Sequence, residues 1–284
     1  ISECLVGSEM CIRDRSWVGG KKALRDIIVN SFPLCYERYI EVFGGGGWVL
    51  FRKPPMNDFE VYNDMNSHLV NLYQCVREHP KELKNELEFV LNSREDFNKT
   101  LEIFKHPDDV ENIKRAALFY QLIKFSYASG LDSYGCRPHS LWSDFPIIYQ
   151  ASARLQRVII ENKDFEKLIN QYDRSASFFY CDPPYYATEK YYSNVGFGTQ
   201  DHERLSEVLL NIKGKFLLSY NDCDEIRNLY NKSGIYIREV ERLNNIKQRY
   251  DGGCKYAELL ISNYDTYERE KAQKQLCFFD DYFS

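Results

Sequence analysis

Short apolar runs recur along the chain, and stretches with helical spacing of apolar residues separate them. Runs rich in aromatic and β-branched side chains, bounded by polar residues, glycines or prolines, are typical of buried strands. They lie at residues 39–43, 61–64, 177–181, 215–221, 235–240 and 256–263. Helical spacing covers residues 23–30, 69–76 and 201–209. The alternation predicts an α/β fold built on an open sheet.

The middle of the chain has a different, mostly helical character. Pro80 can open one helix, and Ser93 with Asp96 forms a near capping box for another. A third helix is expected from Asp108, and a fourth is expected at residues 147–160. We therefore expect an α/β domain interrupted by a helical module.

The expected divisions follow from this change of character. The N-terminal stretch shows no clear helix or strand period. The C-terminal stretch is acidic. The divisions are a non-native or disordered segment at 1–15, an α/β domain at 16–79 and 171–264, a helical module at 80–170 and a tail at 265–284.

A carboxylate follows the apolar run at 177–181 and is followed at once by two prolines. Pro183 and Pro184 cannot donate to a sheet ladder and restrict the residues before them, so Asp182 is expected at the carboxyl end of a strand. In an open α/β sheet that edge binds ligands, and Tyr185 adds a ring that can stack on a planar substrate. An ordinary strand-to-loop turn is the alternative interpretation.

Glycines follow two further elements near the N-terminus. Gly44 to Gly47 come directly after the run at 39–43, where a turn into a helix exposes backbone N–H groups to a ligand. Asp64 stands 17 residues beyond Gly47, at the end of the next strand, where an acid can accept hydrogen bonds from ribose hydroxyls. Its alternative role is that of an acid at a helix N-terminus.

Composition sets limits on the class of protein. With 284 residues, 44% of them hydrophobic, the chain can bury a substantial core. The net charge of −5 means that any nucleic-acid footprint must be local. Nine cysteines show neither a paired spacing nor a zinc pattern, so we expect no metal site and a reducing cytoplasm. No run is long enough to span a bilayer.

Three motifs together resemble a known family. They are Asp182-Pro-Pro-Tyr185, the Trp17-x-Gly-Gly-Lys21 stretch, and Phe43-x-Gly45-x-Gly47. In their order along the chain, 17–21, 43–47 and 182–185, they resemble the motifs of the amino-group DNA methyltransferases, specifically the Dam-type adenine-N6 branch. The resemblance implies a Rossmann-like S-adenosylmethionine methyltransferase sheet with an inserted, mostly helical target-recognition domain, acting on adenine in double-stranded DNA by base flipping.

The resemblance also implies roles for single residues. The catalytic residues would be Asp182, Pro183, Pro184 and Tyr185. The residues that bind S-adenosylmethionine would be Trp17, Lys21, Phe43, Gly45, Gly47 and Asp64.

DNA contacts are expected from the helical module and from a basic loop near the C-terminus. The polar loop at 127–140 carries Arg137, which can read guanine, and Lys124 on the preceding helix can meet a phosphate. Arg249 lies in the basic loop at 242–255. A solvated surface face is the alternative for each scattered basic residue.

Several expectations concern partners and related activities. Gln275 to Phe279 resembles a peptide that docks on the replication sliding clamp, with ordinary packing on the body as the alternative. We expect a monomer that is bacterial or phage-encoded, cytoplasmic and associated with the nucleoid. Methylation of cytosine N4 or of adenine in RNA, or a catalytically silent DNA-binding relative, stays open. Departures from the Dam pattern at 134–139 argue against a GATC target.

Overall fold

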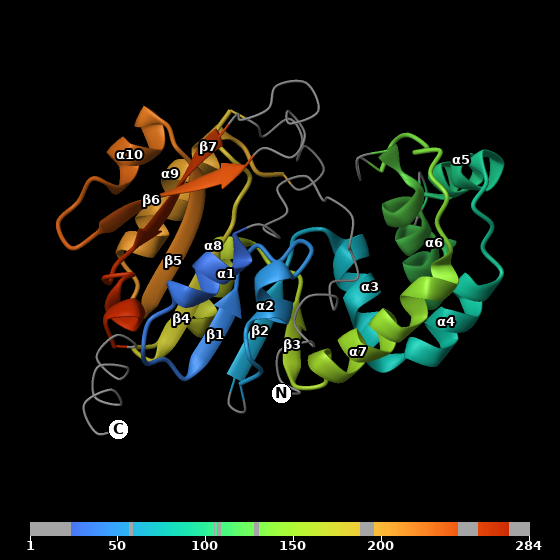
Figure 1. The fold of residues 1–284 in the computed structure, drawn as a ribbon, viewed down its shortest axis with the longest axis horizontal. Coiled ribbons are helices and arrows are strands. Elements are labelled where there is room, and N and C mark those ends of the chain that lie inside the picture. Colours follow the sequence, from blue (N-terminus) through green and yellow to red (C-terminus); the bar gives the residue numbers. More distant parts are fainter. Residues whose placement is uncertain are drawn as a thin grey trace, which may run out of the picture. The chain divides into compact units, whose positions relative to one another are not determined.

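The computed structural model describes residues 24–56, 59–104, 106, 109–127, 131–187, 196–243 and 255–272. Within them a seven-stranded sheet has the order β3-β2-β1-β4-β5-β7-β6 (Figure 1). The strands are β1 (Arg38–Glu41), β2 (Phe59–Asn63), β3 (Val158–Glu161), β4 (Ser177–Cys181), β5 (Lys215–Asn221), β6 (Tyr236–Leu243) and β7 (Lys255–Ser262).

The helices fill the intervals between strands and the middle of the chain. Among the described residues, none of them is long and apolar enough to cross a membrane. They are α1 (Arg25–Asn30), α2 (Trp48–Arg52), α3 (Ser67–Glu78), α4 (Pro80–Glu88), α5 (Arg94–Ile103), α6 (Asn112–Phe125), α7 (Phe145–Leu155), α8 (Phe165–Tyr172), α9 (Thr199–Leu210) and α10 (Asp224–Tyr230).

Strand pairing confirms the α/β prediction. β4 pairs in parallel with β1 on one side and with β5 on the other, so the carboxyl ends of these three strands share one edge. β7 pairs antiparallel with both β5 and β6, which makes the predicted C-terminal hairpin part of the sheet. This mixed sheet is consistent with a Rossmann-like methyltransferase fold.

The chain divides into two compact units. Apart from the gaps given above, the helical unit comprises residues 44–56 and 62–162, and the sheet unit comprises residues 24–43, 59–61 and 163–272. This division differs from the expected one at 79/80 because α3 packs against α6 and α7, and at 170/171 because α8 packs against α9. An inserted target-recognition domain at 80–170 stays a prediction.

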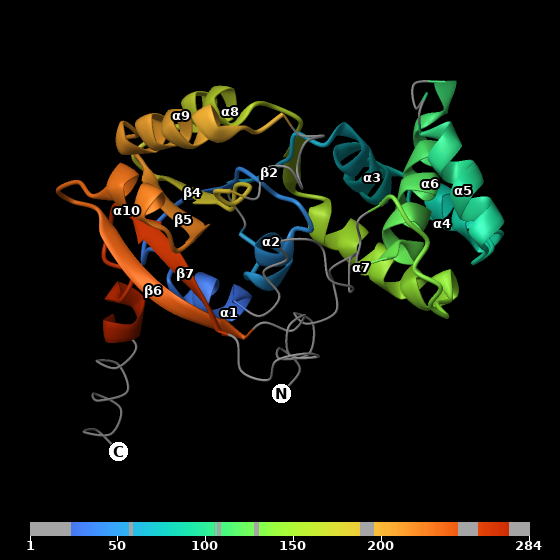
Figure 2. The same ribbon diagram turned by 90° about the horizontal axis from the view of Figure 1, so that it is seen from above.

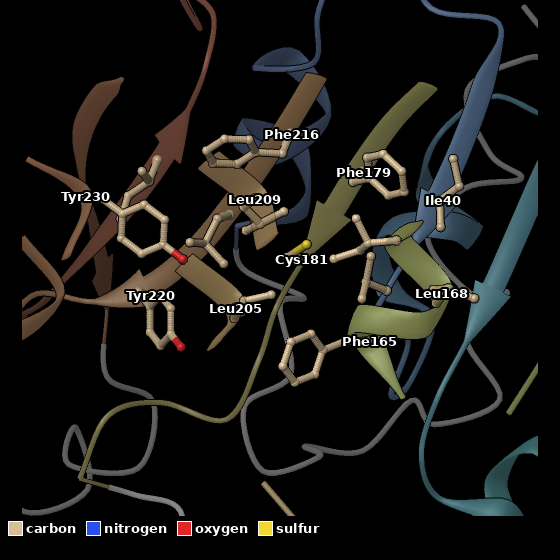
Figure 3. Close-up of a cluster of buried hydrophobic side chains, with 14 of the residues drawn as sticks. Ile40, Phe165, Leu168, Phe179, Cys181, Leu205, Leu209, Phe216, Tyr220 and Tyr230 are labelled. Atoms are coloured by element: carbon tan, nitrogen blue, oxygen red, sulfur yellow. The ribbon is translucent and has the colours of Figure 1, made fainter. Parts of the chain in front are cut away.

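In the sheet unit, β4 is buried on both faces. Its alternate residues Phe179 and Cys181 join a cluster with Leu205, Leu209 and Phe216, shown in Figure 3. Helices α8 and α9 cover this face, and α1 lies on the opposite face (Figure 2). There the Phe178 ring meets that of Phe32 at a centroid distance of 4.7 Å. These contacts fix the strand that precedes Asp182.

Helix starts in the helical unit agree in part with the prediction. Pro80 is the first residue of α4, and the Ser93 hydroxyl accepts a hydrogen bond from the Asp96 N–H, which confirms both signals. The helix expected at 147–160 is wrong in its second half, because α7 ends at Leu155 and the β-branched run from Val158 forms β3.

The start of α10 receives no hydrogen bond from the side chain of its N-cap, which is Cys223. The carboxylate of Asp222 pairs with the Arg227 guanidinium at 2.6 and 2.8 Å. This bidentate, charge-assisted pair engages both oxygens of the Asp222 carboxylate.

Candidate active site

Asp182 stands directly after the last residue of β4, as predicted. The strand ends at Cys181, and Pro183 and Pro184 that follow are buried, while Asp182 is partly exposed. Because neither proline has an N–H, the ladder with β5 ends there. The carboxylate is therefore held at the carboxyl edge of the central parallel strands.

β5 supplies partners for both ends of the segment that carries Asp182. The Ser219 hydroxyl donates to Asp182 Oδ1 at 3.3 Å. At the other end, Asn221 Oδ1 accepts the Tyr186 N–H at 3.1 Å, and Asn221 Nδ2 donates to the Tyr186 carbonyl at 3.4 Å. The segment between them is thus fixed at two points by one strand.

The aromatic residues of this segment pack on the neighbouring strand and helix. The Tyr185 ring lies 6.2 Å from that of Tyr220, and the Tyr186 ring lies 5.2 Å from that of His202. The Tyr220 hydroxyl is 2.5 Å from Nδ1 of His202. The Tyr185 ring packs against Tyr220 but is partly exposed, so a planar ligand can still stack on it.

Burial controls the ionisation of the residues around Asp182. It raises the pKa of Tyr180 well above the usual range, and the negative charge of Asp182 adds to the effect. The pKa of the Cys181 thiol is raised well above its usual range by the same two causes. Tyr180 and Cys181 are therefore neutral beside the carboxylate at physiological pH.

The glycine turn lies in the helical unit and has almost no room for side chains. A Cβ on Gly44 would stand 2.2 Å from Cε2 of Tyr62. Gly45 and Gly47 have φ angles of 49° and 68°, a left-handed conformation that favours glycine. The Gly44 N–H donates to the Asn63 carbonyl at 2.7 Å, which joins the turn to the end of β2.

Asp64 is bound to this turn. Its Oδ2 accepts the Gly45 N–H at 2.7 Å, and its Oδ1 accepts the Asn66 N–H at 2.8 Å. The side chain of Asn66, not that of Asp64, caps α3. The structure thus brings together Asp64 and Gly45, two of the residues that the sequence assigned to the cofactor.

Two tyrosines that the sequence interpretation missed complete the turn. Tyr62 donates to the Gly45 carbonyl at 2.7 Å, and Tyr73 donates to the Gly46 carbonyl at 2.9 Å. Their positions on β2 and α3 carry no motif, so only the pairing of the turn with these elements identifies them. Phe43, in the sheet unit, packs its ring 5.7 Å from both Phe165 and Phe197.

The predicted DNA contacts have different outcomes. Arg137 is exposed, and its carbonyl accepts a hydrogen bond from Asn92 Nδ2 at 2.9 Å. Lys124 is buried, with its ammonium 3.3 Å from Asp144 Oδ2, an atom that also lies 2.8 Å from Nε2 of His139. This burial contradicts a phosphate contact by Lys124, because its charge is directed into the unit.

Other expected residues lie outside the described part of the chain. They are Trp17, Lys21, Arg249, the segment 1–15 and the peptide Gln275 to Phe279. Among the described residues, no group of three or more His, Cys, Asp or Glu side chains is arranged to hold a metal ion.

The described residues form a Rossmann-like sheet in which the segment Asp182-Pro-Pro-Tyr185 follows the central strand. The carboxylate of Asp64 accepts a hydrogen bond from the glycine turn. Together these features define a methyltransferase. Residues 17–246 match the family model of the D12 class N6 adenine-specific DNA methyltransferases. The chain belongs to this family, and its activity is methylation of adenine in DNA.

Individual relatives agree with the family match. A type II methyltransferase of Lactococcus lactis subsp. cremoris, M1.LlaDCHI, is 28% identical over 87% of this chain and 94% of its own length. The type II methyltransferase M.MjaIII of Methanocaldococcus jannaschii is 30% identical over 87% of this chain and 97% of its own. The DNA adenine methylase of Escherichia coli K12 is 27% identical over 80% of this chain and 86% of its own length. The family match favours adenine in DNA over cytosine N4 or RNA.

Proposed function

We propose that the chain transfers the methyl group of S-adenosylmethionine to the 6-amino group of an adenine flipped out of duplex DNA, and that Asp182 is the residue that receives this amino group. The observation that supports the role is the placement of Asp182. Its carboxylate is fixed at the carboxyl edge of the central strands, before two buried prolines and beside a partly exposed tyrosine.

The residues of the glycine turn fit the cofactor. Residues 44–47 are all glycine, so the turn presents only backbone atoms to a ligand. A carboxylate has about four acceptor sites, so Asp64 can accept ribose hydroxyls while it accepts the Gly45 N–H. When bound, S-adenosylmethionine supplies an electrophilic methyl group whose leaving group is a neutral thioether.

Asp182 makes the target nitrogen of adenine more nucleophilic. The lone pair of the adenine amine is delocalised into the purine ring, so the free amine is a poor nucleophile. Asp182 and the Pro183 carbonyl accept its two hydrogens, which favours a pyramidal nitrogen with a localised lone pair. Positive charge that develops on this nitrogen strengthens the hydrogen bond to the carboxylate in the transition state.

The proton balance requires only a weak base. The nitrogen gains a methyl group and gives up one proton, which passes to Asp182 or to water after methyl transfer. Tyr185 stacks on the extrahelical ring and offsets part of the cost of base flipping, which is a few kcal/mol.

Sequence choice is assigned to the loop that carries Arg137. This loop is anchored through Asn92, which donates to the Arg137 carbonyl at 2.9 Å and accepts the Tyr134 hydroxyl on Oδ1 at 2.8 Å. An exposed guanidinium on an anchored loop can form the bidentate contact that distinguishes guanine in the major groove. Lys114, which is exposed on α6, is assigned a phosphate contact.

A methyl-transfer assay with identification of the product tests the proposed function. The protein is incubated with duplex DNA and S-adenosylmethionine labelled with tritium in the methyl group, and the DNA is digested to nucleosides and separated. We expect label in N6-methyl-2′-deoxyadenosine from the DNA. Label in N4-methylcytosine, label only with an RNA substrate, or no label above a protein-free control contradicts the proposal.

A further inference from the structure

Ser219 lies beside Asp182 because of the register between β4 and β5. Tyr180 is paired with Leu217 and Cys181 with Leu218, so continuing the parallel register by one residue sets Asp182 opposite Ser219. Ser219 is fully buried, and its hydroxyl is 3.3 Å from Asp182 Oδ1. A small polar side chain therefore faces the carboxylate from the interior of the sheet.

The hydroxyl of Tyr180 determines how Ser219 donates. Tyr180 is buried and neutral, so it carries a proton that requires an acceptor, and its hydroxyl lies 3.1 Å from Ser219 Oγ. If Tyr180 donates to Ser219, the single proton of Ser219 is available for a further acceptor.

Two acceptors compete for the Ser219 proton. The Cys181 carbonyl lies at 3.5 Å and the Asp182 carboxylate at 3.3 Å. The carboxylate is both nearer and charged, and hydrogen bonds to charged acceptors are about twice as strong as neutral ones. When Tyr180 donates to Ser219, the proton of Ser219 therefore points to Asp182, and a chain of hydrogen bonds runs from Tyr180 through Ser219 to the carboxylate.

We propose that Ser219 is a positioning residue for methyl transfer, which holds the Asp182 carboxylate ionised and in the orientation that receives the adenine amine. This inference rests on the proposed role of Asp182. The prolines fix the backbone after the acid but leave its side-chain torsions unrestrained. The hydrogen bond from Ser219 restrains those torsions, and Tyr180 strengthens it by polarising the hydroxyl.

The matched control is Ser177, at the opposite end of β4. It is also buried and donates one hydrogen bond, to the Tyr172 carbonyl at 2.7 Å. Ser177→Ala therefore removes a comparable buried hydroxyl from β4, the strand that precedes Asp182, without touching Asp182. Tyr180→Phe removes the first donor of the chain and leaves Ser219 in place.

The experiment compares Ser219→Ala, Tyr180→Phe and Ser177→Ala by single-turnover methylation of duplex DNA across a pH series. Binding of S-adenosylmethionine and DNA and stability to urea are measured alongside. For Ser219→Ala we expect a rate about ten- to a hundredfold lower, with both affinities unchanged. The acid limb of its pH–rate profile should move to higher pH, because the carboxylate loses a donor. Tyr180→Phe should lose less than about tenfold, and Ser177→Ala should keep the wild-type rate per folded molecule.

Two results overturn the proposal. One is a Ser219→Ala rate within about threefold of wild type, a change too small for a charge-assisted hydrogen bond. The other is a loss that Ser177→Ala shares and that follows the folded fraction. If Ser219→Ala does not fold, Ser219→Cys keeps a side chain of similar size with a weaker donor and should show a lower rate and a pH shift in the same direction, both smaller than those expected for Ser219→Ala. Substantial activity in Asp182→Ala would instead contradict the proposed function, whatever Ser219 does.

Discussion

Substitution of Gly44 by alanine tests how closely the glycine turn is packed. The added Cβ would lie 2.2, 2.6 and 2.7 Å from three ring atoms of Tyr62, closer than real side chains pack. Tyr62 is fully buried and its ring lies 4.8 Å from that of Tyr73, so it has little space to retreat. Any retreat also displaces the Tyr62 hydroxyl from the Gly45 carbonyl, which it binds at 2.7 Å.

The cost follows from these two effects. Overpacking of a buried site costs about 1–3 kcal/mol, and loss of one buried hydrogen bond adds about 1 kcal/mol. We therefore expect Gly44→Ala to lower the free energy of unfolding by about 2–4 kcal/mol, which a typical domain of about 5–15 kcal/mol survives. Affinity for S-adenosylmethionine should fall at least about tenfold if the turn and Asp64 move together.

Urea unfolding and calorimetric titration measure the two quantities. Gly198→Ala is the control, because the nearest atom to its added Cβ is Asp201 Oδ2 at 4.0 Å. It should cost less than about 1 kcal/mol as a change at a helix N-cap. In Gly44→Ala/Tyr62→Leu the smaller side chain should relieve part of the clash, so the two costs should not add. A Gly44→Ala protein within about 0.5 kcal/mol of wild type would refute the packing argument.

Four further substitutions test the other assignments. Asp64→Ala should weaken binding of S-adenosylmethionine by about 1.5–3 kcal/mol in calorimetry, through loss of a charge-assisted hydrogen bond; unchanged affinity would remove the ribose role. Arg137→Ala should lose about 1–3 kcal/mol of discrimination at one base position, measured on a panel of DNA substrates varied one base at a time. Lys114→Ala should instead weaken binding to all DNA sequences and reduce the salt dependence of that binding. Unchanged base preferences in Arg137→Ala would mean that other residues read the DNA sequence. Asp144→Ala should destabilise the fold by about 3–5 kcal/mol in urea unfolding, because it leaves the buried ammonium of Lys124 without this carboxylate; a change under about 1 kcal/mol would contradict that pairing.

Local signals in the sequence predicted the elements that carry the chemistry. The apolar run before Asp182 coincides with β4, because β-forming residues and the following prolines agree on one structure. Asp64 was expected at the end of a strand, and β2 ends at Asn63 directly before it. Where strand propensity, the apolar pattern and the prolines that end a strand agree, the sequence predicts both the strand and its end.

Tertiary context explains what the sequence did not predict. Lys124 was interpreted as a surface residue, but Asp144, twenty residues further on, neutralises its charge inside the helical unit. The pairing partners of Asp182 and Gly45, which are Ser219 and Tyr62, depend on strand register and on the packing of a turn. Neither is encoded in a local motif, so only the folded arrangement identifies them.

In the proposed function, Asp182 acts on the amine of adenine and not on the cofactor. Single-turnover methylation of duplex DNA by Asp182→Ala, with calorimetric titration of S-adenosylmethionine on the same preparation, tests it most directly. We expect a rate at least about a hundredfold below wild type and a cofactor affinity close to that of the wild type. A rate within about tenfold of wild type, or a loss of activity that is matched by loss of cofactor binding, would contradict it.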